Sequence, residues 1–145
     1  MDSQLTPLPS HLLSSVRINW HITSWCNYSC QYCPVMVFHQ RSRSGETQAH
    51  AFDYHPVGEW LGAIRKFDFQ KIHLKISGGE PFLDRNRFRE LLIGLSRMDH
   101  VRVGVDTNGY WDPAYFKEVD KSKMWVNVAF HPTQRPLEEF LPNLL

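Results

Sequence analysis

Four short segments of this sequence alternate apolar and polar residues with the two-residue period of a β-strand, and segments with helical periodicity lie between them. The strand-like segments are residues 17–23, 71–77, 101–106 and 125–131. Strands and helices that alternate in this way form a parallel sheet, because a right-handed helical crossover returns each strand to the direction of the previous one. The sequence therefore predicts an α/β fold with a parallel sheet.

The clearest helical pattern follows Asp84, which is the predicted N-cap. Its apolar positions recur three and four residues apart, at Phe88, Leu91, Leu92, Leu95 and Met98. The same spacing follows Pro56, at Val57, Trp60, Leu61, Ile64 and Phe67. A short helix is predicted over residues 114–119 behind Asp112 and Pro113, and a last helix begins near Pro136 and soon meets Pro142.

The predicted strands have one apolar face and one polar face, unlike strands that helices cover on both sides. The apolar face holds Ile18, Trp20, Ile22, Ile72, Leu74, Ile76, Val101, Val103, Val105, Val126, Val128 and Phe130. The polar face holds Arg17, Asn19, His21, Thr23, His73, Lys75, Ser77, Arg102, Gly104, Asp106, Asn127, Ala129 and His131. Polar side chains do not fill a dry barrel centre without a large desolvation cost, so we expect a solvated cavity in an open or incomplete barrel. The periodicity leaves open a two-layer sheet with one face in water.

Composition excludes several classes of function. The chain has 145 residues and a formal net charge of +1, so no global field attracts it to nucleic acid or to an anionic membrane. The longest apolar stretches, such as residues 34–38 and 91–95, are far shorter than a membrane-spanning helix, and the first ten residues do not resemble a leader peptide. We therefore expect a cytoplasmic protein that binds neither nucleic acid nor membranes.

The most distinctive loops all follow predicted strands. Because the carboxyl ends of parallel strands meet at one edge of the sheet, where α/β proteins bind ligands, these loops are expected to share one rim. They contain residues 26–33, 78–81, 107–109 and 131–134.

Three cysteines, Cys26, Cys30 and Cys33, lie within the first of these loops. Three thiols cannot all pair with one another, so metal ligation by reduced thiols is the better interpretation. A structural zinc ion would need a fourth ligand. The histidines that would supply it are His21, His39 and His55. An iron–sulfur cubane held by only three thiolates would instead leave one iron open to a substrate or cofactor.

The Cys-x3-Cys-x2-Cys loop after the first strand resembles the signature of the radical S-adenosylmethionine (SAM) superfamily. Three further features stand where this family has them: Tyr32 before the third cysteine, Gly78-Gly79-Glu80-Pro81 after the second strand, and Thr107-Asn108-Gly109 after the third. The resemblance covers residues 16–141. It implies a partial (β/α) barrel in which about four of the family's usual six βα units are present.

This resemblance implies an oxidoreductase with two cofactors, a 4Fe-4S cluster and SAM. Cys26, Cys30 and Cys33 would ligate three irons, and the amino and carboxylate groups of SAM would chelate the fourth. Reduction of the cluster would cleave SAM into methionine and a 5'-deoxyadenosyl radical, which abstracts a hydrogen atom from the substrate. The protein would hold and shield these groups.

The loop after the second strand is expected, by the same resemblance, to bind the methionine end of SAM. Gly78 and Gly79 would let the backbone approach the amino group, and Glu80 would help to fix that cation, with Pro81 in the same loop. The alternative is that the two glycines simply form a tight turn after a strand.

The remaining cofactor contacts are expected from three loops. Tyr32 would lie against the adenine, although an aromatic residue beside a loop cysteine also packs within its own loop. Thr107 and Asn108 would bind the nucleoside or the substrate, or would turn the chain as it leaves the strand. His131 would contact the ribose, at a position where the family often has a small polar or acidic residue.

The polar face suggests a class of substrate. His21, His73, Lys75 and Arg102 would suit a carboxylate or phosphate, provided that neither Asp106 nor solvent satisfies them. Residues 40–50 are polar and rich in turn formers, as in a mobile flap or a plain surface loop.

The predicted domain organisation is an N-terminal extension over residues 1–15 and a radical SAM core over residues 16–145 that is incomplete at its C-terminus. The last strand would then be an exposed edge, so we expect an oligomer or a completing chain. An electron donor such as flavodoxin or ferredoxin is expected as a partner, and the substrate is a small molecule or a peptide. The alternatives are an iron–sulfur fragment or electron-transfer module without SAM turnover, and a structural zinc protein.

Overall fold

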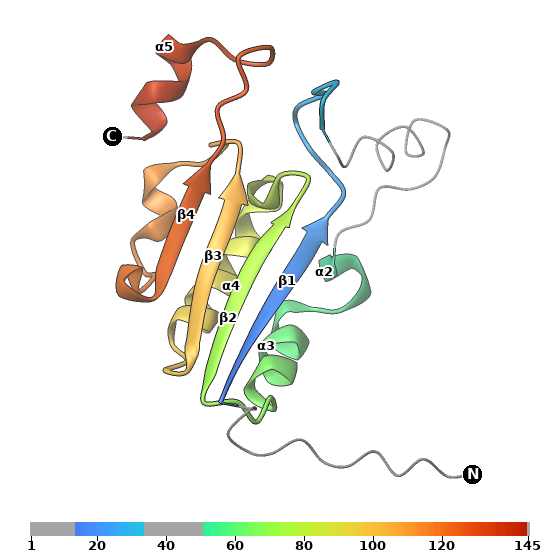
Figure 1. Ribbon diagram of the computed structural model, residues 1–145, viewed down its shortest axis with the longest axis vertical. Coiled ribbons are helices and arrows are strands. Elements are labelled where there is room, and N and C mark those ends of the chain that lie inside the picture. Colours follow the sequence, from blue (N-terminus) through green and yellow to red (C-terminus); the bar gives the residue numbers. More distant parts are fainter. Residues whose placement is uncertain (1–13, 34–50, 145) are drawn as a thin grey trace, which may run out of the picture.

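A parallel four-stranded sheet forms the centre of the structure, a computed structural model that describes residues 14–33 and 51–144. Its strands are β1 (Ser15–Thr23), β2 (Lys71–Gly78), β3 (Val101–Thr107) and β4 (Met124–Val128). They lie in the sheet in chain order, and each neighbouring pair is parallel (Figure 1). The predicted α/β fold with a parallel sheet is confirmed, and it is consistent with a partial (β/α) barrel.

The fourth strand is shorter than its alternating pattern predicts. The pattern extends over residues 125–131, but β4 ends at Val128. At His131 the chain already turns, because the His131 carbonyl oxygen accepts a backbone hydrogen bond from Gln134 (2.9 Å). Pro132 has no N–H group with which to continue a strand ladder. His131 therefore belongs to the loop after β4.

The α-helices are α2 (Ala51–Tyr54), α3 (Val57–Arg65), α4 (Arg85–Ser96) and α5 (Leu137–Phe140) within the described residues. The helix expected after Asp84 is α4, and the predicted N-cap is confirmed: Asp84 Oδ1 accepts a hydrogen bond from the backbone N–H of Arg87 (3.2 Å). The helices expected after Pro56 and Pro136 are α3 and α5.

The helix predicted over residues 114–119 is wrong, since this segment begins with a 3-10 turn, η3 (Pro113–Phe116). Asp112 caps it as expected, by accepting a hydrogen bond from the backbone N–H of Ala114 (2.8 Å). The rings of Tyr115 and Phe116 both pack against Phe82, with centroids 5.2 and 5.9 Å away. We attribute the tighter turn to this aromatic packing, which periodicity does not reveal. The other 3-10 turns of the described residues are η2 (Pro81–Leu83), η4 (Lys121–Lys123) and η5 (Leu141–Asn143).

Helices α3 and α4 cover one face of the sheet, and the opposite face, here called the open face, carries no helix of the described residues (Figure 1). The covered face carries the predicted apolar set, whose members on β2 and β3 are almost completely buried: Ile72, Leu74, Ile76, Val101, Val103 and Val105. Phe88, Leu91 and Leu95 of α4 are fully buried against them. Each such side chain stabilises the fold by roughly 1.5–3 kcal/mol. The predicted division into an apolar and a polar face is confirmed for β2 and β3. It is wrong for Phe130, which is exposed beyond the end of β4, and for Thr23, which is buried at the end of β1.

Some predictions fall outside the described residues. These are most of the N-terminal extension, the segment 40–50 and His39. In the described part of the chain, no helix has the length and apolar content needed to cross a bilayer.

Candidate cofactor site

The four loops that follow the strands enclose one cavity of about 280 Å³, here called the cofactor cavity. The predicted site residues in its wall are Cys26, Cys30, Cys33, Gly78, Gly79, Thr107, Asn108 and His131. Tyr28 completes the cysteine side, and His21, Ser77, Asp106 and Ala129 extend the wall toward the open face of the sheet. Tyr32, Glu80 and Pro81 are not part of this wall. The rim predicted from parallel strand ends therefore exists and is concave.

The cysteine loop is held by bonds within itself and by one bond to a distant loop. The Cys30 carbonyl oxygen accepts a backbone hydrogen bond from Cys33 (3.2 Å). The backbone N–H of Ser29 donates to Oε1 of Gln134 in the loop after β4 (3.0 Å). Cys30 is buried, Cys26 and Cys33 are half-buried, and all three are free thiols. The loop is thus positioned by both edges of the sheet.

The sulfur of Cys26 lies near two hydrogen-bond donors. The backbone N–H of Tyr28 lies 3.4 Å from Cys26 Sγ, and Asn108 Nδ2 lies 3.8 Å from it. Asn108 Nδ2 also donates to Oδ1 of Asn27 (2.8 Å). The pKa of Cys26 is raised overall, because burial outweighs the lowering by the Tyr28 N–H. These donors favour the thiolate, which is the form that binds metals.

The three sulfurs line one cavity without meeting at a point. Among the described residues, no group of three or more His, Cys, Asp or Glu side chains is gathered as a single ion would require. Three thiols around a cavity of this size are the soft donor set that iron–sulfur clusters take. The residues present fit a cluster in their chemistry.

The loop after β2 packs directly on the chain that leaves β1. The backbone N–H of Gly79 donates to the carbonyl oxygen of Thr23 (2.8 Å), and that of Glu80 donates to the carbonyl oxygen of Trp25 (2.6 Å). A Cβ on Gly79 would overlap the Trp25 carbonyl, and one on Gly78 would overlap the Thr23 carbonyl. Gly78 also has a φ of 137°. The two glycines are therefore required by the β1 exit, and their contact with SAM stays a prediction.

Glu80 is fully buried and connects the end of β2 to the end of β3. Its Oε1 accepts hydrogen bonds from the backbone N–H of Phe82 (3.0 Å) and from Thr107 Oγ1 (2.8 Å). Its Oε2 accepts from the backbone N–H of Asn108 (2.7 Å). Burial raises the pKa of Glu80 to about 7, although these three hydrogen bonds act to lower it. The carboxyl group thus positions Asn108, and its predicted contact with the SAM amino group is untested.

His131 lies against the cysteine loop. Its Nδ1 is 3.5 Å from Cys30 Sγ and 3.0 Å from the Tyr32 hydroxyl. The rings of His131 and Tyr32 are stacked at a centroid distance of 5.9 Å, and Tyr28 meets His131 edge-on at 5.7 Å. Tyr32 is 57% exposed. These contacts join the loops after β1 and β4, whereas the predicted adenine and ribose contacts stay predictions.

Comparison with known proteins identifies the family. The model described as the radical SAM superfamily matches residues 20–142. The chain belongs to this superfamily. The resemblance carried by the cysteine loop and the loops after β2 and β3 is thereby confirmed.

Two curated radical SAM relatives share a name. A protein of Fibrobacter sp. (strain UWH6), named S-adenosylmethionine-dependent nucleotide dehydratase, is 34% identical over 99 residues, which cover 67% of this chain and 28% of the relative. A protein of the same name from Psychrobacter lutiphocae is 27% identical over 96 residues, which cover 63% of this chain and 32% of the relative. The matched part of the chain thus spans about a third of each relative's length or less. No solved structure matches the chain.

The open face of this radical SAM core is polar, but its basic groups are largely satisfied by the chain itself. Lys75 Nζ lies 2.9 Å from a carboxylate oxygen of Asp106. Arg102 donates to the carbonyl oxygen of Asp99 (3.1 Å). The condition set for binding a carboxylate or phosphate therefore fails for Lys75, which pairs with Asp106, whereas for Arg102 it stays a prediction. His21 remains in the wall of the cofactor cavity.

Two side chains at the radical SAM site, and one on the open face of the sheet, were not expected from the sequence. Tyr28 lines the cavity and supplies the N–H nearest Cys26 Sγ, and its place within the cysteine loop was an available signal. Gln134 fixes the cysteine loop from a distant segment, which no local pattern indicates. Trp125 lies on the open face over Gly104, where a Cβ would strike its ring. It is 43% exposed.

Proposed function

We propose that this chain holds a 4Fe-4S cluster and SAM in the cofactor cavity and carries out the reductive cleavage of SAM. The observation that supports this most strongly is that all three cysteine thiols line a single cavity with Gly78, Gly79 and Asn108. That cavity lies at the carboxyl ends of parallel strands, where α/β proteins bind their ligands. Membership of the radical SAM superfamily is the second support.

The cluster and SAM, when bound, would supply an electron and a 5'-deoxyadenosyl radical that removes a hydrogen atom from the substrate. Cys26, Cys30 and Cys33 would be the cluster ligands. The Tyr28 N–H and the Asn108 amide would stabilise the negative charge on Cys26 Sγ, since hydrogen bonds to ligand sulfurs tune such centres. The backbone at Gly78 and Gly79 would form the wall against the methionine end of SAM.

Glu80 is a positioning residue in this proposal. Its carboxyl group binds the hydroxyl of Thr107 and the backbone N–H of Asn108, and so it holds the end of β3 against the loop after β2. Asn108 in turn reaches Cys26. Glu80 therefore acts on the site through Asn108, although Glu80 itself does not line the cofactor cavity.

For the substrate we propose a nucleotide that loses water in the reaction. The support is the shared name of the two relatives, both called nucleotide dehydratases. The cofactor cavity opens toward the polar face of the sheet through His21, Ser77 and Asp106, which offers hydrogen-bonding groups to a polar substrate. This substrate stays a proposal, because the matched part of the chain covers only 28% and 32% of the two relatives.

The test is anaerobic reconstitution of the chain with iron and sulfide, followed by dithionite and SAM. We expect a brown protein with about four irons and four sulfides per chain, and formation of 5'-deoxyadenosine. Single Cys-to-Ser variants at positions 26, 30 and 33 should lose both, whereas Ser29→Ala, which alters the same loop without removing a thiol, should retain both. Zinc in place of iron, or a brown colour that survives replacement of all three cysteines, would refute the proposal. A cluster without 5'-deoxyadenosine would leave only an iron–sulfur module.

A further inference from the structure

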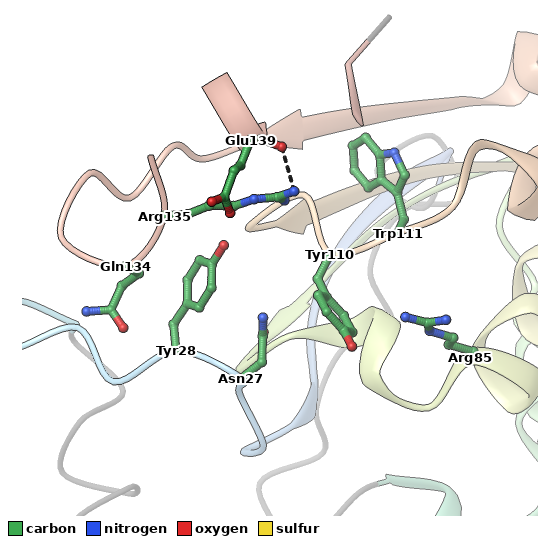
Figure 2. Close-up of a pocket in the computed structure, with 8 residues that line it drawn as sticks. All are labelled: Asn27, Tyr28, Arg85, Tyr110, Trp111, Gln134, Arg135 and Glu139. Atoms are coloured by element: carbon green, nitrogen blue, oxygen red, sulfur yellow. Dashed lines mark hydrogen bonds between the residues drawn. The ribbon is translucent and has the colours of Figure 1, made fainter. Parts of the chain in front are cut away.

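A second pocket, of about 320 Å³, is lined in part by the cysteine loop and shares Tyr28 with the cofactor cavity. Figure 2 draws the residues that line it. Asn27 and Tyr28 of the cysteine loop form part of its wall, together with Arg85 at the start of α4, Tyr110 after β3 and Arg135 after β4. We call it the arginine pocket. Of the residues that the structure describes, Tyr28 alone lines both this pocket and the cofactor cavity.

Two guanidinium groups give the arginine pocket its charge. The guanidinium carbon of Arg85 lies 5.1 Å from the centroid of the Tyr110 ring. Arg135 donates to the backbone carbonyl oxygen of Glu139 (2.6 Å), as Figure 2 shows. Neither arginine forms an ion pair with a carboxylate anywhere in residues 14–33 or 51–144. Glu139 contributes the one acidic side chain among the described wall residues, so positive charge predominates.

The wall of the arginine pocket is in direct contact with the thiols. Tyr28 donates its backbone N–H toward Cys26 Sγ, and its ring meets His131, whose Nδ1 lies 3.5 Å from Cys30 Sγ. The side chain of Asn27 accepts a hydrogen bond from the same Asn108 amide that approaches Cys26. A single layer of residues therefore separates an occupant of this pocket from two of the three proposed cluster ligands.

We propose that the arginine pocket and its rim are the docking surface for an acidic one-electron donor protein. This inference rests on the proposed function, which requires an electron to reach the cluster while the cofactor cavity is filled. The arginine pocket offers a separate approach to the same loop. Its guanidinium groups, which have no carboxylate partner among the described residues, are complementary to surface carboxylates. The step breaks no bond: the donor's redox group loses one electron, and the 2+ cluster gains it and becomes 1+.

The experiment uses photoreduced flavodoxin as the donor and follows the cluster's visible absorbance in a stopped-flow instrument. At low salt and limiting flavodoxin, Arg85→Gln should slow cluster reduction about three- to ten-fold, because a rim charge acts mainly on the rate of association. Arg85→Lys, which keeps the charge, should restore most of the rate. Glu139→Gln should raise the rate about two-fold. The dependence of the rate on salt should weaken in Arg85→Gln.

The matched control is Arg65→Gln, an exposed arginine at the end of α3, from which the chain runs to the amino end of β2. It removes the same charge at the opposite end of the strands and should leave the flavodoxin rate within about two-fold of the original. Dithionite needs no docking surface, so its reduction of each cluster separates this proposal from the previous one. Suppose that dithionite reduces the clusters of both variants and that flavodoxin reduces Arg85→Gln as fast as Arg65→Gln. That result would overturn the docking surface and leave the proposed function in place. Citrate binding that is lost in Arg85→Gln, with an unchanged flavodoxin rate, would identify a small-anion pocket and also overturn it. A chain that forms no cluster would overturn both the docking surface and the proposed function.

Discussion

The buried carboxyl group of Glu80 makes a prediction about how the stability of the fold depends on pH. Its side chain is fully buried, and burial raises its pKa from 4.5 to about 7. Well below pH 4.5 the group is protonated in both the folded and the unfolded chain. Between 4.5 and about 7 the unfolded chain loses this proton while the folded chain keeps it. The native state then binds more protons, so the Glu80 contribution to the free energy of unfolding falls as pH rises.

The magnitude follows from the difference between the two pKa values. A rise from 4.5 to about 7 corresponds to about 3 kcal/mol, fully expressed only above about pH 7. In Glu80→Gln the side chain is neutral at every pH, so this dependence disappears. Glu80 accepts hydrogen bonds from three donors, and the amide nitrogen of Gln must face one of them. The lost hydrogen bond lowers the free energy of unfolding by about 1–3 kcal/mol at all pH values.

The assay is urea unfolding of the original chain and of Glu80→Gln between about pH 5 and pH 8, because the difference between the two cancels the titration of all other groups. We expect the free energy of unfolding of the original chain to fall by about 2.5 kcal/mol relative to the variant over this range, because part of the full effect is already expressed at pH 5. Glu90→Gln, which removes an exposed carboxylate from α4, is the control for loss of one negative charge. A difference that stays constant, or that moves in favour of the original chain as pH rises, would show that the three hydrogen bonds outweigh burial and would refute the reasoning.

Three further substitutions test the loop after β2, helix α3 and the open face. Gly79→Ala should destabilise the fold by several kcal/mol, on the order of 2–5, because its Cβ would overlap the carbonyl oxygen of Trp25. Gly58→Ala in α3, where a Cβ would meet no atom within 4 Å, should instead stabilise by up to about 1 kcal/mol. Equal urea midpoints for the two alanine variants would contradict this. Lys75→Gln should cost less than about 1 kcal/mol, since Lys75 and its carboxylate partner are both more than a third exposed. A loss above about 2 kcal/mol in thermal or urea unfolding would show that the pair is not an ordinary surface ion pair.

The sequence predicted those features that depend on local pattern and on the direction of the strands. The apolar face could be predicted because alternation places Ile72, Leu74 and Ile76 on one side of a strand. The shared rim could be predicted because parallel strands end at the same edge. The N-cap at Asp84 is likewise a short-range signal.

Contacts between segments could not be predicted in the same way. The ion pair of Lys75 with Asp106 depends on the register between β2 and β3, in which Lys75 is opposite Gly104. The burial of Glu80 depends on how the β1 exit packs over the following loop. A sequence contains the residues of such contacts, but it does not contain the register or packing that joins them.

The order of the strands in the sheet affects how such a fold can be built. Each strand lies beside the strand that precedes it in the chain. During synthesis, every newly emerged strand can therefore dock on the edge left by its predecessor, without insertion between strands already paired. Because β1 and β4 are the two edge strands of the described sheet, a further strand at either edge would leave the existing pairings intact.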